Sequence, residues 1–183
     1  MELTVIVTTL PERARLLSRC LWHLENQTIR NFEVLVMHGP RMKGDKLNMA
    51  FQHVDTSHLM MVDDDDYISP VLVEHVLSYD DDFIGYNALQ TVGGMFTTVI
   101  EQEVASHICP IRADLARSVP FGNHYLADIE WTKTVAPLVE SNVHLDEVLY
   151  FYDKWNPPGP VSGWSPPRNV GPWPHDKSLH RWL

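Results

Sequence analysis

Four consecutive aspartates, Asp63 to Asp66, are the residues of this sequence whose types and spacing point most directly to chemistry. They come directly after the apolar run HLMMV (58–62), and an aromatic residue and Pro70 follow them. Adjacent carboxylates repel one another, and a bound cation would relieve that repulsion. Carboxylate oxygens are hard ligands that suit Mg²⁺ or Mn²⁺, which in turn bridge substrate phosphates. The alternative is a solvated acidic turn, the ordinary explanation of a charge run. The position after an apolar strand favours a site.

Other patterns argue against competing kinds of site. The ligand spacing of an EF-hand calcium loop is absent, and so are the P-loop and the G-x-G-x-x-G phosphate-binding loop. The histidines on predicted helices have no partner at metal-ligand spacing. The sequence has 2 cysteines, too few for a disulfide scaffold. Cys20 falls on the apolar stripe of a predicted helix, where a buried thiol is expected.

The elements that must position the aspartates alternate between strand and helix. The segment LTVIVTT is β-branched and continuous, as in a strand buried on both faces. The patterns predict strands at 3–9, 32–39 and 58–62 and helices at 11–26, 44–54 and 69–78. Such alternation favours parallel strands with right-handed crossovers. The aspartates would then lie at the carboxyl ends of these strands, where ligands bind in open α/β sheets.

The second half is less regular. Strands are expected at 82–88, 93–100 and 144–155, and helices at 111–119 and 125–139. From Trp155 onward prolines are too dense for regular helix or sheet. Disordered tails are poor in aromatic residues, so the four tryptophans of this segment favour a strap laid over the body.

Length, composition and net charge narrow the kinds of protein that this chain can be. With 183 residues and 44% hydrophobic residues, the chain is expected to form one domain with a core of its own. The formal net charge of −10 makes duplex nucleic acid an unfavourable partner. The start MELTVIVTTLPER has no basic region, so no signal peptide is expected. No window has the apolar length of a membrane span. The expected location is cytoplasmic.

Several segments, taken in order, resemble the nucleotide-sugar-dependent glycosyltransferases of family 2, which have the GT-A fold. The opening TVIVTTLPERARLLSRCLWHLENQT is similar to the family's first strand, Thr-containing turn, arginine, and helix ending in Gln-Thr. KGDKLNMAFQHV resembles the helix before the third strand, and MMVDDDDYISP resembles the Asp-x-Asp-Asp segment followed by proline. HICPIRADLARSVPF and LADIEWTKTV resemble the region of the Glu-Asp base motif. The similarity spans about residues 3–152.

The resemblance implies a fold and its divisions. It implies a single GT-A (Rossmann-like) α/β domain with a central mixed, mostly parallel sheet flanked by helices. This domain would cover residues 1–154, with a nucleotide-binding half at about 1–80 and an acceptor half at about 81–154. Residues 155–183 would form the Pro/Trp-rich C-terminal strap.

The resemblance also implies roles for matching residues. Counting back from Pro70, Asp65 matches the aspartate that binds the divalent metal, Mn²⁺ or Mg²⁺, and Asp63 is taken as a second ligand. The residues implied to bind the nucleotide or donor are Thr8, Thr9, Arg13, His38, Lys46, Asn48, Asp63 and Asp64. Asp128 matches the general base. Glu130 and Trp131 match the acidic and bulky residues after it, on the acceptor side.

The chain departs from the family pattern in three ways. Its second strand ends in VLVMHGP, with His38 where the family has an aspartate that contacts the nucleoside, although Asp45 could substitute. Ala127 precedes Asp128 where the family has glutamate, so only one carboxylate of the base motif, that of Asp128, is present. The third departure is length, because this chain lacks the long acceptor-binding additions of many relatives.

The function expected from these observations is a metal-dependent, inverting glycosyltransferase of the hexosyltransferase type. Its partners would be a UDP- or GDP-sugar donor and an acceptor that is a glycan, a protein or a small molecule. Two alternatives stay open. One is a nucleotidyl- or phosphoryl-transfer enzyme that uses the same aspartates. The other is a non-catalytic relative that binds nucleotides or sugars.

Overall fold

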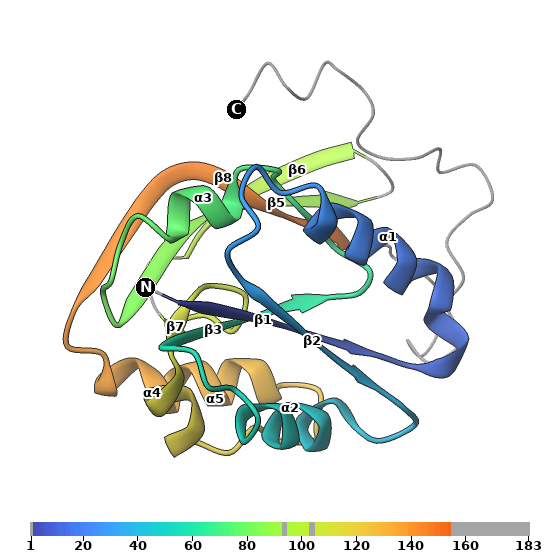
Figure 1. Cartoon of the computed structure of the whole chain (residues 1–183), viewed down its shortest axis with the longest axis horizontal. Helices are drawn as coiled ribbons and strands as arrows, with labels where there is room; N and C mark the ends of the chain where they lie inside the picture. The colour runs from blue at the N-terminus through green and yellow to red at the C-terminus, as the bar shows by residue number, and fades with distance from the viewer. Residues whose placement is uncertain (1, 93–94, 103–104, 155–183) are drawn as a thin grey trace.

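An eight-stranded mixed sheet forms the centre of the computed structural model, which describes residues 2–92, 95–102 and 105–154 (Figure 1). The strands are β1 (Leu3–Thr9), β2 (Glu33–His38), β3 (His58–Asp63), β4 (Tyr67–Ile68), β5 (Phe83–Val92), β6 (Met95–Glu101), β7 (Ile111–Arg112) and β8 (Asn142–Lys154). The helices are α1 (Ala14–Glu25), α2 (Lys43–Phe51), α3 (Leu72–Val76), α4 (Ala113–Ser118) and α5 (Ala127–Val135), with short 3₁₀ turns at Pro11–Arg13 and Ala136–Leu138.

The first three long strands form the parallel part of the sheet, in the order β2-β1-β3. Every residue of β1 is buried, as its unbroken β-branched run predicts. The register places Thr8 beside Met37 of β2 and beside Asp63 of β3. The carboxyl ends of β1 and β3 therefore lie next to each other, and the four aspartates start at that edge.

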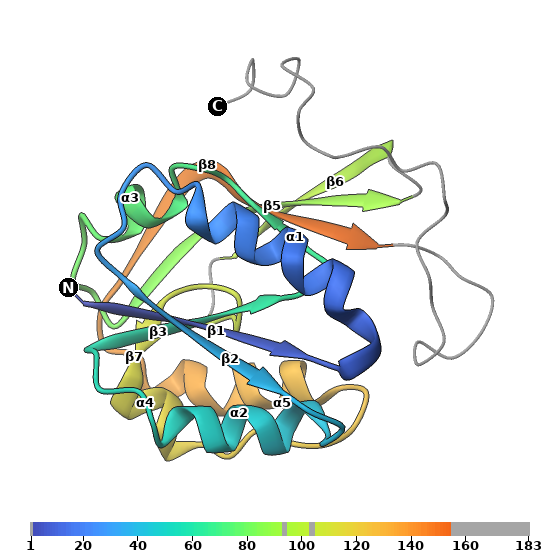
Figure 2. The same ribbon diagram turned by 45° about the vertical axis from the view of Figure 1, so that its right-hand side comes forward.

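Helices cover both faces of the sheet (Figures 1 and 2). Helices α1 and α3 lie on one face, and α2, α4 and α5 lie on the other. The inner face of α1 is formed by Leu16, Cys20 and Leu24, which recur every four residues and are buried. Such a stripe packs on the sheet, and Arg15 and Glu25 of α1 stay exposed. The molecule thus has three layers, with the sheet in the middle.

The second half of the chain extends the same sheet. Strands β5 and β8 run parallel over most of their length, and β6 pairs with β5 in antiparallel orientation. The two-residue strand β7 joins the halves, because it pairs with both β3 and β5. The equally short β4 follows the aspartates and pairs with β8. This pairing brings the end of the chain's described part against the aspartate loop.

The expected α/β architecture is confirmed, and so is the order of its main strands and helices. Two differences are instructive. The helix expected at 69–78 is confined to Leu72–Val76, and β4 and β7 were not foreseen. A strand of two residues is too short to show an alternating pattern in the sequence, so it can be recognised only from its pairing with other strands. The strap expected at 155–183 lies outside the described residues. Among the described helices, none has the length and apolar character needed to cross a bilayer.

Candidate active site

The aspartate loop turns sharply where β3 ends. The Asp66 amide donates a hydrogen bond to the Asp63 carbonyl at 3.1 Å, which closes a tight turn over the four residues. The guanidinium of Arg19, on α1, donates to the Asp65 carbonyl from outside the turn. In a turn, consecutive side chains point in different directions. The four carboxylates therefore do not act as one cluster but divide into two groups.

Three of them converge. One carboxylate oxygen each of Asp63, Asp65 and Asp66 lies within 4.8 Å of the others. Asp66 is buried, whereas Asp63 and Asp65 keep 26% and 31% of their side-chain surface exposed. Three hard oxygen donors that lie this close together, two of them partly open to solvent, fit Mg²⁺ or Mn²⁺, which keeps part of its shell for water and phosphate. Of the expected metal ligands, the structure brings Asp63 and Asp65 together and adds Asp66.

Asp64 points the other way, into the protein. It is 1% exposed and accepts a 2.6 Å hydrogen bond from the Thr9 hydroxyl at the end of β1. Its other oxygen lies 3.0 Å from the Arg13 guanidinium. Burial raises the pKa of Asp64 to about 6, against the opposing effects of Thr9 and Arg13. Asp64 thus links the aspartate turn to the loop after β1, where Thr9 and Arg13 were expected to meet the nucleotide.

Two positively charged side chains form ion pairs with the carboxylates of the turn. Besides Asp64, Arg13 contacts the Asp65 carboxylate at 2.6 Å, and the Lys43 ammonium contacts Asp63 at 2.6 Å. Burial alone would raise the pKa of Asp63, but the groups around it, Lys43 foremost, together lower the pKa. These ion pairs offset the repulsion within the turn. They also place two positive groups where a phosphate oxygen could accept hydrogen bonds. Lys43, at the start of α2, was not among the expected site residues.

Lys46 joins the ends of the first two strands. Its buried ammonium donates to the Thr9 carbonyl at 2.7 Å and to the Gly39 carbonyl, just after β2, at 3.1 Å. Burial lowers its pKa. His38, the last residue of β2, is exposed, and Thr8 lies within β1 beside Asp63. Lys46 therefore acts on the backbone of the loops that border the site.

Asn48 bonds to the chain itself. Its side-chain amide donates to the Phe121 carbonyl at 2.9 Å and accepts from the Phe121 amide at 2.7 Å. A close approach of α2 to the segment before α5 permits this, because a Cβ on Gly44 would lie 2.2 Å from the Gly122 carbonyl oxygen. Asp45, the possible substitute nucleoside contact, exchanges hydrogen bonds with Asn123 in the same contact. These residues dock α2 onto the segment before α5.

The expected base, Asp128, lies in the first turn of α5. One of its oxygens accepts a hydrogen bond from the Ile129 amide at 2.9 Å, and the side chain is partly exposed. Glu130 is exposed and lies 3.1 Å from His124. Trp131 is 2% exposed, donates from its indole to the Val119 carbonyl and packs against Phe121. The start of α5 therefore offers two accessible carboxylates, and Trp131 belongs to the core.

His107 links the aspartate turn to α5 and was missed from the sequence. Its carbonyl accepts a hydrogen bond from Met61 of β3 at 3.0 Å, and its ring is buried. Burial lowers its pKa to about 4, with help from Lys43 and against the carboxylates of Asp63 and Asp128. The buried ring thus lies within electrostatic reach of Asp63 and of the expected base, Asp128. No sequence spacing marks it, because it comes from an irregular loop.

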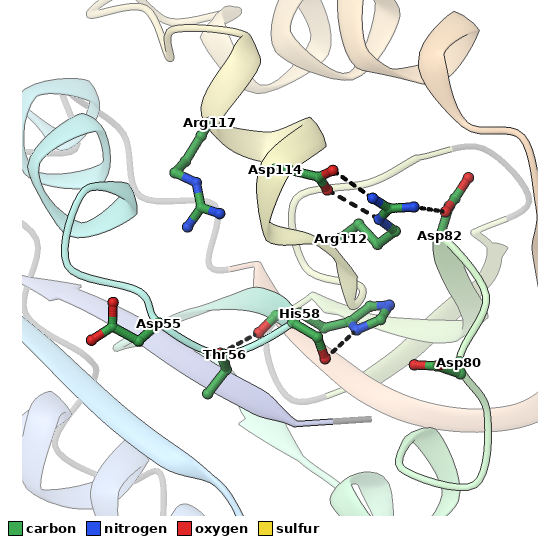
Figure 3. A pocket seen from close by; sticks show the side chains of 9 residues that line it. Asp55, Thr56, His58, Asp80, Asp82, Arg112, Asp114 and Arg117 are labelled. Carbon is green, nitrogen blue, oxygen red and sulfur yellow. Dashed lines mark hydrogen bonds and ion pairs between the residues drawn. The ribbon is translucent and has the colours of Figure 1, made fainter.

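A separate cavity of about 450 Å³ opens at the opposite, amino-terminal end of β3 (Figure 3). Arg112 lies in it between Asp82 and Asp114, at 3.2 and 2.5 Å. Asp82 also accepts hydrogen bonds from the backbone amides that precede β8. Arg117 donates to the Val54 carbonyl. The charged groups of this cavity therefore tie strands and loops together.

No protein-family model and no curated protein matches the sequence. Solved structures do match the fold. S. aureus TarS 1–349 in complex with UDP-GlcNAc superimposes with a TM-score of 0.72 and 16% identity, over 90% of this chain and 62% of that one. The mannosyltransferase PcManGT from Pyrobaculum calidifontis, in complex with GDP-Man and Mn²⁺, gives 0.61 and 15%, over 81% and 56%. The chain has the GT-A fold.

The GT-A fold expected from the sequence is thus confirmed. The chain spans less than two thirds of the length of these two structures. The match to TarS reaches 90% of this chain, so it takes in both the parallel half and most of the second half.

The placement of Asn48 generates a test. In an Asn48→Ala variant, the Phe121 amide and carbonyl both lose their partner in a partly buried position. The free energy of unfolding should fall by about 1–3 kcal/mol, as for other unsatisfied backbone groups. Urea unfolding measures it, with exposed Asn31→Ala as the matched control. Unchanged stability together with lost nucleotide binding would instead make Asn48 a direct ligand.

Proposed function

We propose that this protein is a metal-dependent, inverting glycosyltransferase of the hexosyltransferase type, resembling family 2. It would transfer a sugar from a UDP- or GDP-sugar to a hydroxyl of a glycan, a protein or a small molecule. The observation that supports this best is the convergence of Asp63, Asp65 and Asp66 at the carboxyl edge of the parallel strands, flanked by two cations. The bound ligands of the neighbours agree with it: UDP-GlcNAc in TarS, and GDP-Man with Mn²⁺ in PcManGT.

The donor side needs groups that bind a nucleoside diphosphate. Asp63, Asp65 and Asp66 would hold Mn²⁺ or Mg²⁺, which when bound neutralises charge that develops on the diphosphate leaving group. Arg13 and Lys43 contact the same carboxylates and would donate hydrogen bonds to phosphate oxygens. Thr8, Thr9 and His38 border the edge at which the nucleoside would lie. Lys46 would keep the bordering loops together rather than touch the donor.

The acceptor side needs a base. Asp128 would take the proton of the acceptor hydroxyl while that oxygen attacks C1 of the sugar. The bond between C1 and the phosphate oxygen breaks, and its electron pair leaves with the nucleoside diphosphate. A single displacement of this kind inverts the anomeric centre. Glu130 is the second carboxylate on this side, two residues farther along α5.

The donor side and the acceptor side also suggest how the chain is divided. We propose that residues 1–80 form the nucleotide-binding half and residues 81–154 the acceptor half of one domain. Residues 155–183 are the Pro/Trp-rich extension of this division.

Changing Asp65→Asn tests the metal site. The variant loses a ligand charge, so Mn²⁺-dependent binding of UDP or GDP should weaken at least about 100-fold, which is about 2.8 kcal/mol. Titration calorimetry with and without Mn²⁺ measures it. Asp55→Asn, which removes one charge from the opposite end of the sheet, is the matched control and should bind like the wild type. Undiminished metal-dependent affinity in Asp65→Asn would refute the assignment.

Changing Asp128→Asn tests the base. The amide keeps the size of the side chain but cannot accept the proton, so turnover should fall by about two to four orders of magnitude. Donor and metal affinity should hardly change, because the residue lies on the acceptor side. A helix-capping role instead predicts a loss of about 0.5–2 kcal/mol in stability with turnover nearly intact.

The assay uses a panel of UDP- and GDP-sugars with Mn²⁺, and NMR of the product reports its anomeric configuration. Glu140→Gln, which changes an exposed carboxylate to which no role is assigned, is the control and should retain most of the activity. Full activity in Asp128→Asn, or a product with retained configuration, contradicts the proposed mechanism.

A further inference from the structure

We infer that Tyr150 is a positioning residue that holds the aspartate turn in the shape required for cation binding. The inference rests on the proposed function, since it concerns the carboxylates assigned there to the metal. The structure gives its hydroxyl two specific partners, and both belong to the turn.

The pairing of β4 with β8 determines where the tyrosine lies. Tyr150 is opposite Ile68 in this antiparallel pair, two residues beyond the end of the aspartate turn. Its ring is fully buried, at 0% exposure, and lies beside the ring of Tyr152 with 5.2 Å between centroids. The side chain therefore has little freedom, and its hydroxyl is held at a fixed point under the turn.

That hydroxyl contacts both ends of the turn. It accepts a hydrogen bond from the Asp63 amide at 3.2 Å and donates one to Oδ2 of Asp66 at 2.8 Å. The first bond fixes the backbone from which the Asp63 carboxylate extends. The second fixes the Asp66 carboxylate itself, which is buried. Two of the three converging carboxylates are thus oriented by one rigid group from another strand.

Outer partners of this kind are needed because carboxylates repel one another. Without the hydroxyl, the Asp66 carboxylate would lose the donor at 2.8 Å that orients it, and the Asp63 amide would lose its acceptor at 3.2 Å. Hydrogen bonds that orient metal-ligating carboxylates typically change metal affinity by about 10–100-fold when they are removed. If Tyr150 served for packing alone, its hydroxyl would not be needed, because phenylalanine would fill the same space.

Tyr150→Phe separates the two roles, and Tyr86→Phe is its matched control. Tyr86 is also fully buried, lies on the neighbouring strand β5, and donates its hydroxyl hydrogen to the Ile108 carbonyl rather than to an aspartate. Each variant loses one buried hydroxyl, so urea unfolding should report a lower midpoint for both. Only Tyr150→Phe should weaken Mn²⁺ binding in calorimetry, by about 10–100-fold, while Tyr86→Phe stays within about twofold of the wild type.

A second measurement does not depend on the metal. Hydrogen exchange of the Asp63 amide, followed by NMR in Mn²⁺-free protein, should be faster in Tyr150→Phe than in the wild type and unchanged in Tyr86→Phe after correction for global stability. Equal Mn²⁺ affinity of wild type and Tyr150→Phe overturns the inference, and so does equal protection of the Asp63 amide. If the wild type binds no Mn²⁺, the proposed function fails, and the amide measurement alone decides whether Tyr150 holds the turn.

Discussion

Repulsion among four adjacent carboxylates is the constraint on which the rest of the structure depends. The turn at Asp63 to Asp66 separates the side chains into a buried Asp64 and three converging neighbours. Arg13 and Lys43 supply opposite charge, while Thr9 and Tyr150 supply hydrogen bonds. None of these groups comes from β3 itself. The end of β1 and the 3₁₀ turn after it, the start of α2, and β8 each contribute, so segments far apart in the sequence stabilise the turn together.

This dependence explains the topology around the site. Parallel pairing places the ends of β1 and β3 side by side, and the crossover helices α1 and α2 begin at that same edge. A cation that entered the carboxylate group would compete with Arg13 and Lys43 for the same oxygens. Once released, those side chains would be free to contact a diphosphate. The present ion pairs and the proposed donor complex are therefore two arrangements of one set of charges.

Much of this could be predicted from the sequence, because the signals are local. The β-branched run 3–9, the helical stripe with Cys20 at its centre, and the aspartates after HLMMV indicate the α/β fold and one edge of the site. The GT-A architecture was implied by the resemblance of these segments, taken in order, to family 2. The assignment of Asp63 and Asp65 to the metal was implied by the same resemblance.

What could not be predicted depends on contacts between distant segments. Tyr150 lies 84 residues from its partner Asp66, and Asn48 lies 73 residues from Phe121. His107 follows an irregular stretch with no periodicity. Which of the four aspartates turns inward depends on one tight turn, and a uniform run of identical residues gives no sign of it. Periodicity reports which face of an element is buried but not which side chain of another element it meets.

The most direct measurement is anomalous diffraction from crystals grown with Mn²⁺ and UDP or GDP. The account predicts a manganese peak within coordination distance of Asp63, Asp65 and Asp66, with the nucleotide's phosphates on the same ion and Lys43 and Arg13 turned toward them. A nucleotide bound elsewhere, or no peak while Arg13 and Lys43 remain on the carboxylates, would contradict it.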